Sequence, residues 1–177
     1  MAVGSKTMNE TQLVVFDLAS ENYGVDISSV REIMRMQNIT RVPGALSYME
    51  GVINLRGKVL PVLDLRKRLS LTVTAQTKDS RVVVIDITAG EVGVIVDAVS
   101  EVLRIPDSAV EPPSAMITQA NTDYLMGIAK LTDRLIILLD LNKLLSTGMD
   151  GASLAALIKS DTVLEEKEPE LAAAAAG

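Results

Sequence analysis

Four aspartates are the side chains of this chain that could perform acid–base chemistry. Asp64 and Asp140 each stand in a Leu-Asp-Leu run, and Asp17 and Asp86 each follow a run of apolar residues. Two carboxylates in one cleft can act as general acid and general base. The 177 residues contain no His and no Cys, which removes the commonest metal ligands, the usual base at neutral pH and thiol chemistry. An enzyme that used a carboxylate pair would need these aspartates to converge; a Ser–Lys pair is also possible, but the sequence has no motif for it.

The positions of the aspartates follow a duplication of the whole chain. Residues 11–35 align with 80–104 with eight of 25 positions identical, and residues 48–69 align with 124–145 with eight of 22 identical. Chance gives roughly two matches in such a window. A repeat of about 70 residues is too long for a solenoid unit, so it indicates two copies of one small domain. The junction between two such copies is a natural place for a binding site.

Each aspartate occurs once per copy at an equivalent place. Asp17 corresponds to Asp86, and Asp64 corresponds to Asp140. Positions that both copies keep are expected to serve the fold, so a cap or turn hydrogen bond is favoured over a catalytic pair. We therefore predict a protein that is not an enzyme, with no catalytic residue, no metal and no cofactor.

One candidate binding residue lies where the two copies differ. The first copy has Asn54-Leu55-Arg56-Gly57 at a hairpin tip, and the second has Lys130-Leu131-Thr132-Asp133. An arginine held out on a hairpin can pair with a carboxylate or stack on a flat group. An ordinary exposed arginine would give the same pattern, and the residues alone leave both readings open.

The elements that must position these residues are short strands with turns every 8–12 residues. This pattern predicts an all-β protein with two pseudo-repeated five-stranded antiparallel barrels, SH3- or OB-like, side by side. We expect barrels at 10–78 and 79–147, with strand exchange between them left open. Short helices are expected at Ser28–Met34, capped by Ser28 or Ser29, and at Ala45–Glu50. Residues 148–177 are expected to hold a C-terminal helix (Ser153–Lys159) and an acidic, alanine-rich, solvated tail.

Composition narrows the function further. The net charge is −6, with one Phe and no Trp, which disfavours the alternative of an OB-like nucleic-acid-binding module. The longest aliphatic run, Leu135–Leu139, is far shorter than a membrane span, and the polar N-terminus is no signal peptide. We expect a soluble cytoplasmic protein that binds other proteins and does not insert into a membrane.

Several motifs together resemble the CheW family. They are residues 23–33 (YGVDISSVREI), residues 51–65 (GVINLRGKVLPVLDL), residues 93–103 (GVIVDAVSEVL) and residues 124–128 (YLMGI). The resemblance covers roughly residues 11–145. It implies two five-stranded barrels in a scaffold without catalytic activity. CheW-like proteins couple membrane chemoreceptors to the histidine kinase CheA, binding the CheA regulatory domain and the cytoplasmic tip of the receptor. The resemblance also implies a monomer when free, recruited to receptor–kinase arrays at the inner face of the membrane.

The resemblance also assigns residues. It implies a receptor-binding groove between the barrels, in which an apolar receptor helix would lie, with Arg56 at the rim. The groove residues are Val30, Glu32, Ile33, Arg56 and Val82; the residues that support the hairpin are Gly51, Asn54 and Gly57; and the residues expected to contact CheA are Ile39 and Met116. Because Glu32 has a twin in Glu101, a structural duty is expected for Glu32 as well.

Overall fold

The computed structural model describes residues 9–44, 47–113 and 124–146. Its elements, in chain order, are β1 (Glu10–Leu18), β2 (Glu21–Asp26), η1 (Ile27–Ser29), β3 (Val30–Arg35), β4 (Met49–Leu55), β5 (Lys58–Asp64), α1 (Leu65–Arg68), β6 (Arg81–Ile87), β7 (Gly90–Val96), β8 (Ala98–Pro106), η2 (Asp107–Ala109), β9 (Val110–Glu111), β10 (Leu125–Lys130), β11 (Leu135–Leu139) and α2 (Leu141–Ser146). The predicted C-terminal helix and tail lie outside the described residues. No helix within the described ranges is long and apolar enough to cross a membrane.

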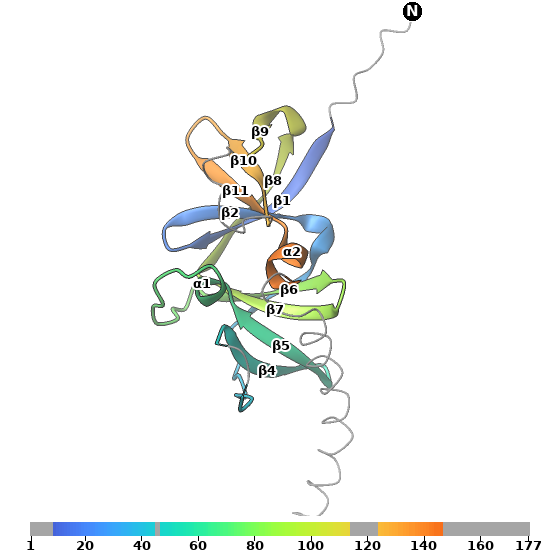
Figure 1. Cartoon of the computed structure of the whole chain (residues 1–177), viewed down its shortest axis with the longest axis vertical. Coiled ribbons are helices and arrows are strands. Elements are labelled where there is room, and N and C mark those ends of the chain that lie inside the picture. Colours follow the sequence, from blue (N-terminus) through green and yellow to red (C-terminus); the bar gives the residue numbers. More distant parts are fainter. Residues whose placement is uncertain (1–8, 45–46, 114–123, 147–177) are drawn as a thin grey trace, which may run out of the picture.

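The strands form two barrels that exchange strands between the two copies (Figure 1). One sheet has six strands in the order β8-β1-β2-β11-β10-β9, and the other has five in the order β3-β6-β7-β5-β4. The first copy thus gives β1 and β2 to the six-stranded barrel and β3 to β5 to the five-stranded barrel. The prediction of an all-β protein with two barrels is confirmed. The expected boundaries at 10–78 and 79–147 do not match the sheets, because each barrel needs strands from both copies.

The exchange preserves one strand order in both barrels. Each barrel contains one parallel pair among otherwise antiparallel strands: β2 with β11, and β7 with β5. Leu138 pairs with Gly24 in one barrel, and Val62 pairs with Gly93 in the other, which are repeat-equivalent pairs. The expectation of wholly antiparallel barrels is wrong for these pairs, because the closing strand arrives from the other copy.

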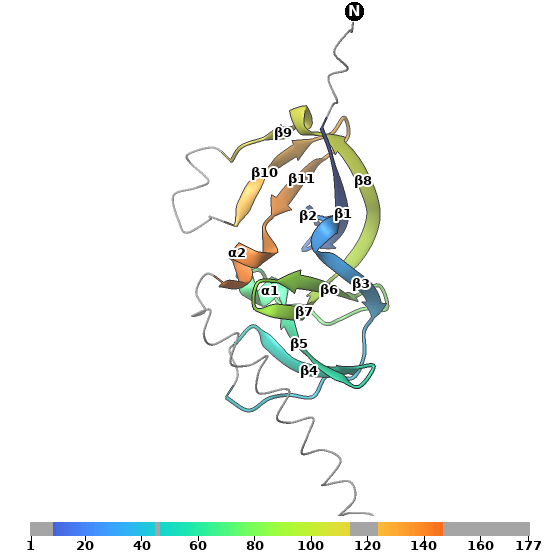
Figure 2. The same ribbon diagram turned by 90° about the vertical axis from the view of Figure 1, so that its right-hand side faces the viewer.

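The space between the barrels is filled with apolar side chains. Phe16 of β1, Ile85 of β6 and Leu144 of α2 are fully buried in one cluster that includes residues of both sheets. Two smaller clusters fill the barrel interiors, one around Leu13 and one around Val82. The inner strands therefore bury both faces, which explains their continuous apolar runs. Figure 2 shows the two barrels stacked, with α1 and α2 between them.

The secondary structure differs from the prediction at the two segments where short helices were expected. The segment after β2 makes only the single 3-10 turn η1, capped by Asp26, whose Oδ1 accepts a hydrogen bond from the Ser28 N–H at 2.9 Å. The turn ends at Ser29, and β3 begins at Val30 because the β-branched and alternating pattern favours an edge strand. Met49 and Glu50 belong to β4 and not to a helix, because Met49 pairs with Leu63 of β5 and Glu50 lies at the register shift that follows. The two serines are therefore not the caps.

The Asp97 carboxylate ties the two barrels together across their boundary. It accepts hydrogen bonds from Arg66 Nε of α1 at 2.7 Å and from the Ala19 N–H of the β1–β2 turn at 2.9 Å. Burial by itself raises the pKa of Asp97, but the hydrogen bonds from Arg66 and Ala19 and the charge of Arg66 outweigh it, so the pKa is lowered below 3.8. The ionised carboxylate is therefore favoured in the folded state.

This arrangement predicts a pH-dependent contribution to stability. A carboxyl with a lowered folded pKa stabilises the fold above its ordinary pKa, and the contribution is lost as the pH falls through the folded pKa. We expect Asp97→Asn to lower the free energy of unfolding at pH 7 by about 1 kcal/mol, given partial solvent screening. Urea unfolding at pH 7 and at successive values below 3.8 should show the gap to the wild type narrowing. A gap that stays constant with pH would contradict the assignment.

Candidate functional site

The two expected receptor-binding residues with opposite charge meet at an exposed corner of the five-stranded barrel. Arg56 Nη2 at the β4–β5 hairpin tip lies 2.8 Å from Glu32 Oε1 on β3. The Arg56 side chain is 75% exposed and the Glu32 side chain 29% exposed. Barrel closure brings the hairpin tip over β3, because β3 and β4 are the outer strands of this sheet. Such an exposed pair contributes about 0–1 kcal/mol and can exchange partners easily.

Arg56 occupies a backbone conformation that arginine rarely adopts. Its φ is +53° and that of Gly57 is +81°, as a two-residue hairpin turn requires. The Asn54 side-chain oxygen accepts a hydrogen bond from the Gly57 N–H at 2.8 Å, which holds the turn. Asn or Gly would adopt the left-handed conformation at lower cost than Arg. A strained position occupied by a long charged side chain is a sign that the side chain has a use there.

The six-stranded barrel has an equivalent ion pair between a glutamate and a hairpin arginine, but this arginine is less exposed. Glu101, the twin of Glu32, pairs with Arg134 of its own barrel's hairpin. The Arg134 side chain is only 27% exposed, and its Nε has no hydrogen-bond partner among the described residues. Both glutamates therefore fasten a hairpin to an edge strand, which is the structural duty expected of Glu32. The widely exposed hairpin arginine is found in the first copy, at Arg56, and not at Arg134 of the second.

The three apolar residues expected to line the groove point in different directions. Val30 is half-buried against the cluster between the barrels, and Ile33 is 40% exposed on the outer face of β3. Val82 is 0% exposed, inside the five-stranded barrel with Val62 and Ile95. The expectation that Val82 lines an open groove is wrong, because β6 is an inner strand of this sheet and both of its faces are covered. Val30 and Ile33 remain at the accessible edge.

The residues expected to contact CheA are only partly placed. Ile39 is half-buried on the five-stranded barrel, and its Cγ2 lies within 2.9 Å of where a Cβ on Gly51 would stand. The neighbouring Thr40 bridges to Val52 of β4 with two backbone hydrogen bonds. Met116 lies outside the described residues. Ile39 thus belongs to a segment held firmly against β4.

The four aspartates have structural partners. Asp64 caps α1 by accepting from the backbone N–H groups of Arg66 and Lys67, and Asp140 Oδ1 accepts from the Lys143 N–H. Asp17 accepts from the Asn22 side chain, and Asp86 pairs with Arg31. Asp86 and Asp140 line one small hollow with Asp26, while neither Asp17 nor Asp64 lines it. The predicted cap role of Asp64 and Asp140 is confirmed. Burial raises the pKa of Asp64, partly offset by its two backbone hydrogen bonds.

Two features escaped the sequence argument. Arg68 of α1 lies over the rings of Tyr48 and Tyr124, 5.7 and 5.9 Å from their centroids. Tyr48 and Tyr124 occupy equivalent positions in the two copies, and this identity was the sequence signal that could have pointed to them. The second feature is an apolar hollow in the six-stranded barrel. Among the described residues, no group of three or more His, Cys, Asp or Glu side chains is arranged to hold a metal ion.

Comparison with known proteins places this architecture. Residues 12–149 match the model of the CheW-like domain. The chain is 34% identical over 150 residues to the chemotaxis protein CheW of Klebsiella aerogenes, covering 83% of this chain and 90% of the relative. It is 36% identical over 134 residues to that of Bacillus subtilis, covering 76% and 86%. The crystal structure of the scaffolding protein TtCheW from Thermoanaerobacter tengcongensis superposes with a TM-score of 0.73 at 40% identity, covering 81% of this chain and 96% of that chain.

Two strand-exchanged barrels with an exposed, charged edge, together with this structural match, define a β-barrel scaffold protein. The chain belongs to the CheW family of chemotaxis scaffold proteins. The resemblance of its motifs to this family is thereby confirmed.

Proposed function

We propose that this scaffold couples chemoreceptors to the histidine kinase CheA, without catalysis of its own. It would bind the regulatory domain of CheA and the cytoplasmic tip of the receptor. It would act in the cytoplasm, as a monomer when free and within a receptor–kinase array at the inner face of the membrane when assembled.

The exposed Glu32–Arg56 pair carries this proposal. Arg56 stays 75% exposed although Glu32 holds it, and it keeps a left-handed backbone angle that Asn would occupy more cheaply. Next to this pair, Ile33 offers apolar surface for a receptor helix, and Val30 adds a half-buried neighbour. The proposed receptor-binding surface is therefore Val30, Glu32, Ile33 and Arg56, with Val82 supporting β3 from inside. An acidic receptor residue would share or replace Glu32 as the partner of Arg56.

For the kinase we propose a separate contact. Ile39 is half-buried on the segment that bridges to β4, which is separate from strand β3 that carries the exposed Ile33. This separation would let one scaffold hold receptor and kinase together. Met116 is proposed as the second kinase contact, on the resemblance of its surrounding sequence.

Reversing the charge of Arg56 tests the receptor contact. We expect Arg56→Glu to weaken binding of a receptor-tip fragment several-fold, because the new carboxylate repels both Glu32 and an acidic partner. Arg56→Asn should also weaken binding, while raising stability by about 0.5 kcal/mol at this left-handed position. Binding is measured by titration calorimetry, with urea unfolding of the same samples.

The matched control is Lys130→Glu, an equal charge change at an exposed pair with Glu111 in the other barrel. It should leave receptor binding unchanged. Equal binding by folded Arg56→Glu and wild-type protein would refute the receptor surface proposed here. Separate pull-downs with the CheA regulatory domain then show whether the kinase contact is independent.

A further inference from the structure

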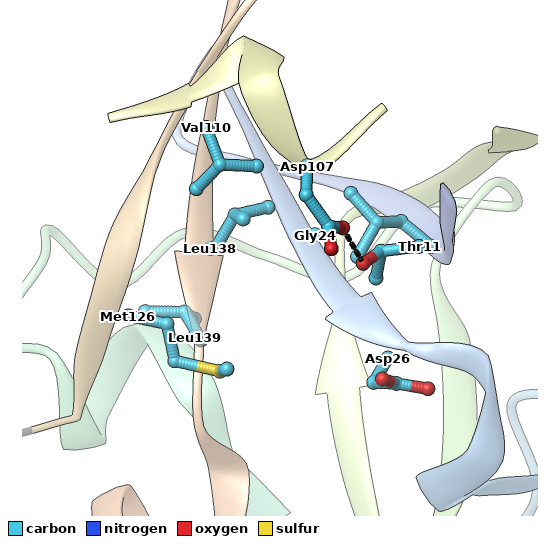
Figure 3. A pocket seen from close by; sticks show the side chains of 9 residues that line it. Thr11, Gly24, Asp26, Asp107, Val110, Met126, Leu138 and Leu139 are labelled. Atoms are coloured by element: carbon cyan, nitrogen blue, oxygen red, sulfur yellow. Dashed lines mark hydrogen bonds between the residues drawn. The ribbon is translucent and has the colours of Figure 1, made fainter. Parts of the chain in front are cut away.

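The six-stranded barrel has an open apolar hollow at one end (Figure 3). It has a volume of about 260 Å³ and is lined by Thr11, Leu13, Gly24, Asp26, Asp107, Val110, Met126, Leu138 and Leu139. Met126 is 56% exposed at this place, although it is a large apolar side chain. The hollow belongs to the other barrel from the Glu32–Arg56 pair, so receptor binding as proposed does not use it.

The duplication shows what fills the same space in the five-stranded barrel. Asp26 corresponds to Ile95, which is 6% exposed and belongs to that barrel's core. Val110 corresponds to Ile39, since each lies against the Cβ direction of an equivalent glycine, Gly127 or Gly51. Inside the barrel, Ala129 likewise replaces Ile53. Smaller or charged residues thus stand where the five-stranded barrel has three isoleucines, and two of them, Asp26 and Val110, line the hollow.

The rim of the hollow is acidic. The Asp26 carboxylate accepts a hydrogen bond from the capping Ser28 N–H, and Asp107 accepts one from the Thr11 hydroxyl at 2.8 Å. Neither carboxylate has a basic partner among the residues that the structure describes. A second hollow, lined by Asp26, Asp86 and Asp140, shares Met126 and Leu139 with the first. The apolar hollow therefore opens beside the carboxylates of Asp26 and Asp107, whereas Asp86 of the second hollow is paired with Arg31.

We propose that this hollow receives a partner segment that presents an aliphatic side chain beside a lysine or arginine. The aliphatic side chain would occupy the space that isoleucines fill in the other barrel, against Leu13 and Leu138. The neighbouring cation would pair with Asp26 at the rim. Met126 would adapt its unbranched side chain to the entering group. Burial of the apolar side chain supplies the affinity, and the acidic rim selects a basic neighbour.

The test is a titration of the full chain, with labelled methyl groups, by the peptide acetyl-Lys-Leu-Lys-amide. We expect saturable shifts of the Met126 and Leu138 methyl signals, and none with acetyl-Glu-Leu-Glu-amide or acetyl-Lys-Ala-Lys-amide. Asp26→Asn removes the charge yet keeps an oxygen to cap Ser28. It should weaken binding roughly threefold or more. Val110→Phe, which fills the hollow, should abolish the saturable shifts.

Controls separate this site from the rest of the molecule. Asp133→Asn removes an acidic charge from the hairpin tip and should not change the titration. Arg56→Glu, which tests receptor coupling, should not change it either. No shift in the wild type up to about 10 mM peptide would overturn the proposal, because the hollow would then be closed by the chain itself or by its shape. Equal shifts with the acidic peptide, or in folded Val110→Phe, would overturn it as well.

Discussion

Replacing Gly51 with alanine is expected to lower the free energy of unfolding by about 3–5 kcal/mol. Gly51 has a φ of +148°, which side chains rarely adopt. A Cβ there would lie 2.1 Å from the Thr40 carbonyl oxygen and 2.9 Å from Ile39 Cγ2. Neither can withdraw easily, because Thr40 makes two backbone hydrogen bonds to Val52. Urea unfolding followed by circular dichroism measures the loss.

Two other glycines provide matched comparisons. Gly57→Ala also places a side chain at positive φ, +81°, but meets nothing within 4 Å, so it should cost only about 1 kcal/mol. Gly127→Ala, the repeat-equivalent of Gly51, would place a Cβ 2.6 Å from the Glu111 oxygen and should fall between the two. Equal losses at Gly51 and Gly57 would show that the backbone angle alone, and not the contact with Thr40, sets the cost.

Loss of the Arg68 guanidinium is expected to have the second largest effect, about 2–3 kcal/mol for Arg68→Met. The guanidinium lies over both Tyr48 and Tyr124, and its Nε donates to the Leu144 oxygen of α2 at 2.9 Å. It therefore joins side chains of both copies at the boundary between the barrels. Methionine keeps an unbranched apolar stem but removes the charge and the donor.

Double-mutant cycles apportion this effect. Arg68→Met is combined in turn with Tyr48→Leu and Tyr124→Leu, and urea unfolding gives the coupling energy of each pair. We expect coupling of about 0.5–1 kcal/mol with each ring. Arg68→Lys should recover only part of the loss, because an ammonium lacks the flat face that lies between the rings. Coupling to neither tyrosine would show that the two rings do not contribute to the effect of Arg68.

Comparison of the two copies within the sequence explains which features of the site could be predicted. Glu32 and Glu101 are identical, and both proved to hold a hairpin arginine. Arg56 differs between the copies, because the second copy has Thr132 at that place. Of the two hairpin arginines, Arg56 is widely exposed and Arg134 is not. The alignment of the two copies also contained a signal for the hollow, because Asp26 aligns with Ile95. This difference could be interpreted only once the structure showed that Ile95 is buried inside a barrel.

The burial of Val82 could not be predicted from the family resemblance or from the pattern of apolar residues. A valine in an alternating strand can face a partner or a core, and only its neighbours decide. Because β6 lies between β3 and β7, the side chain of Val82 is enclosed by Val62 and Ile95. The same holds for the junction between the barrels, which the sequence suggested as an open groove and which apolar residues of both sheets fill. Partner contact is left to the edge at Val30 and Ile33.

The sequence by itself determined the local features of this protein: two copies, short strands, the Asn54–Gly57 hairpin and the aspartate caps. Each depends on residues close together in the chain, whose turn and capping chemistry is independent of distant partners. Only the tertiary structure decided which strand joins which barrel, because β5 and β7, and β2 and β11, pair across the two copies. Both copies have nearly the same apolar pattern, so pairing within or between them satisfies that pattern equally. The choice lies in how the whole core packs, and the same packing left a hollow at one end of the six-stranded barrel.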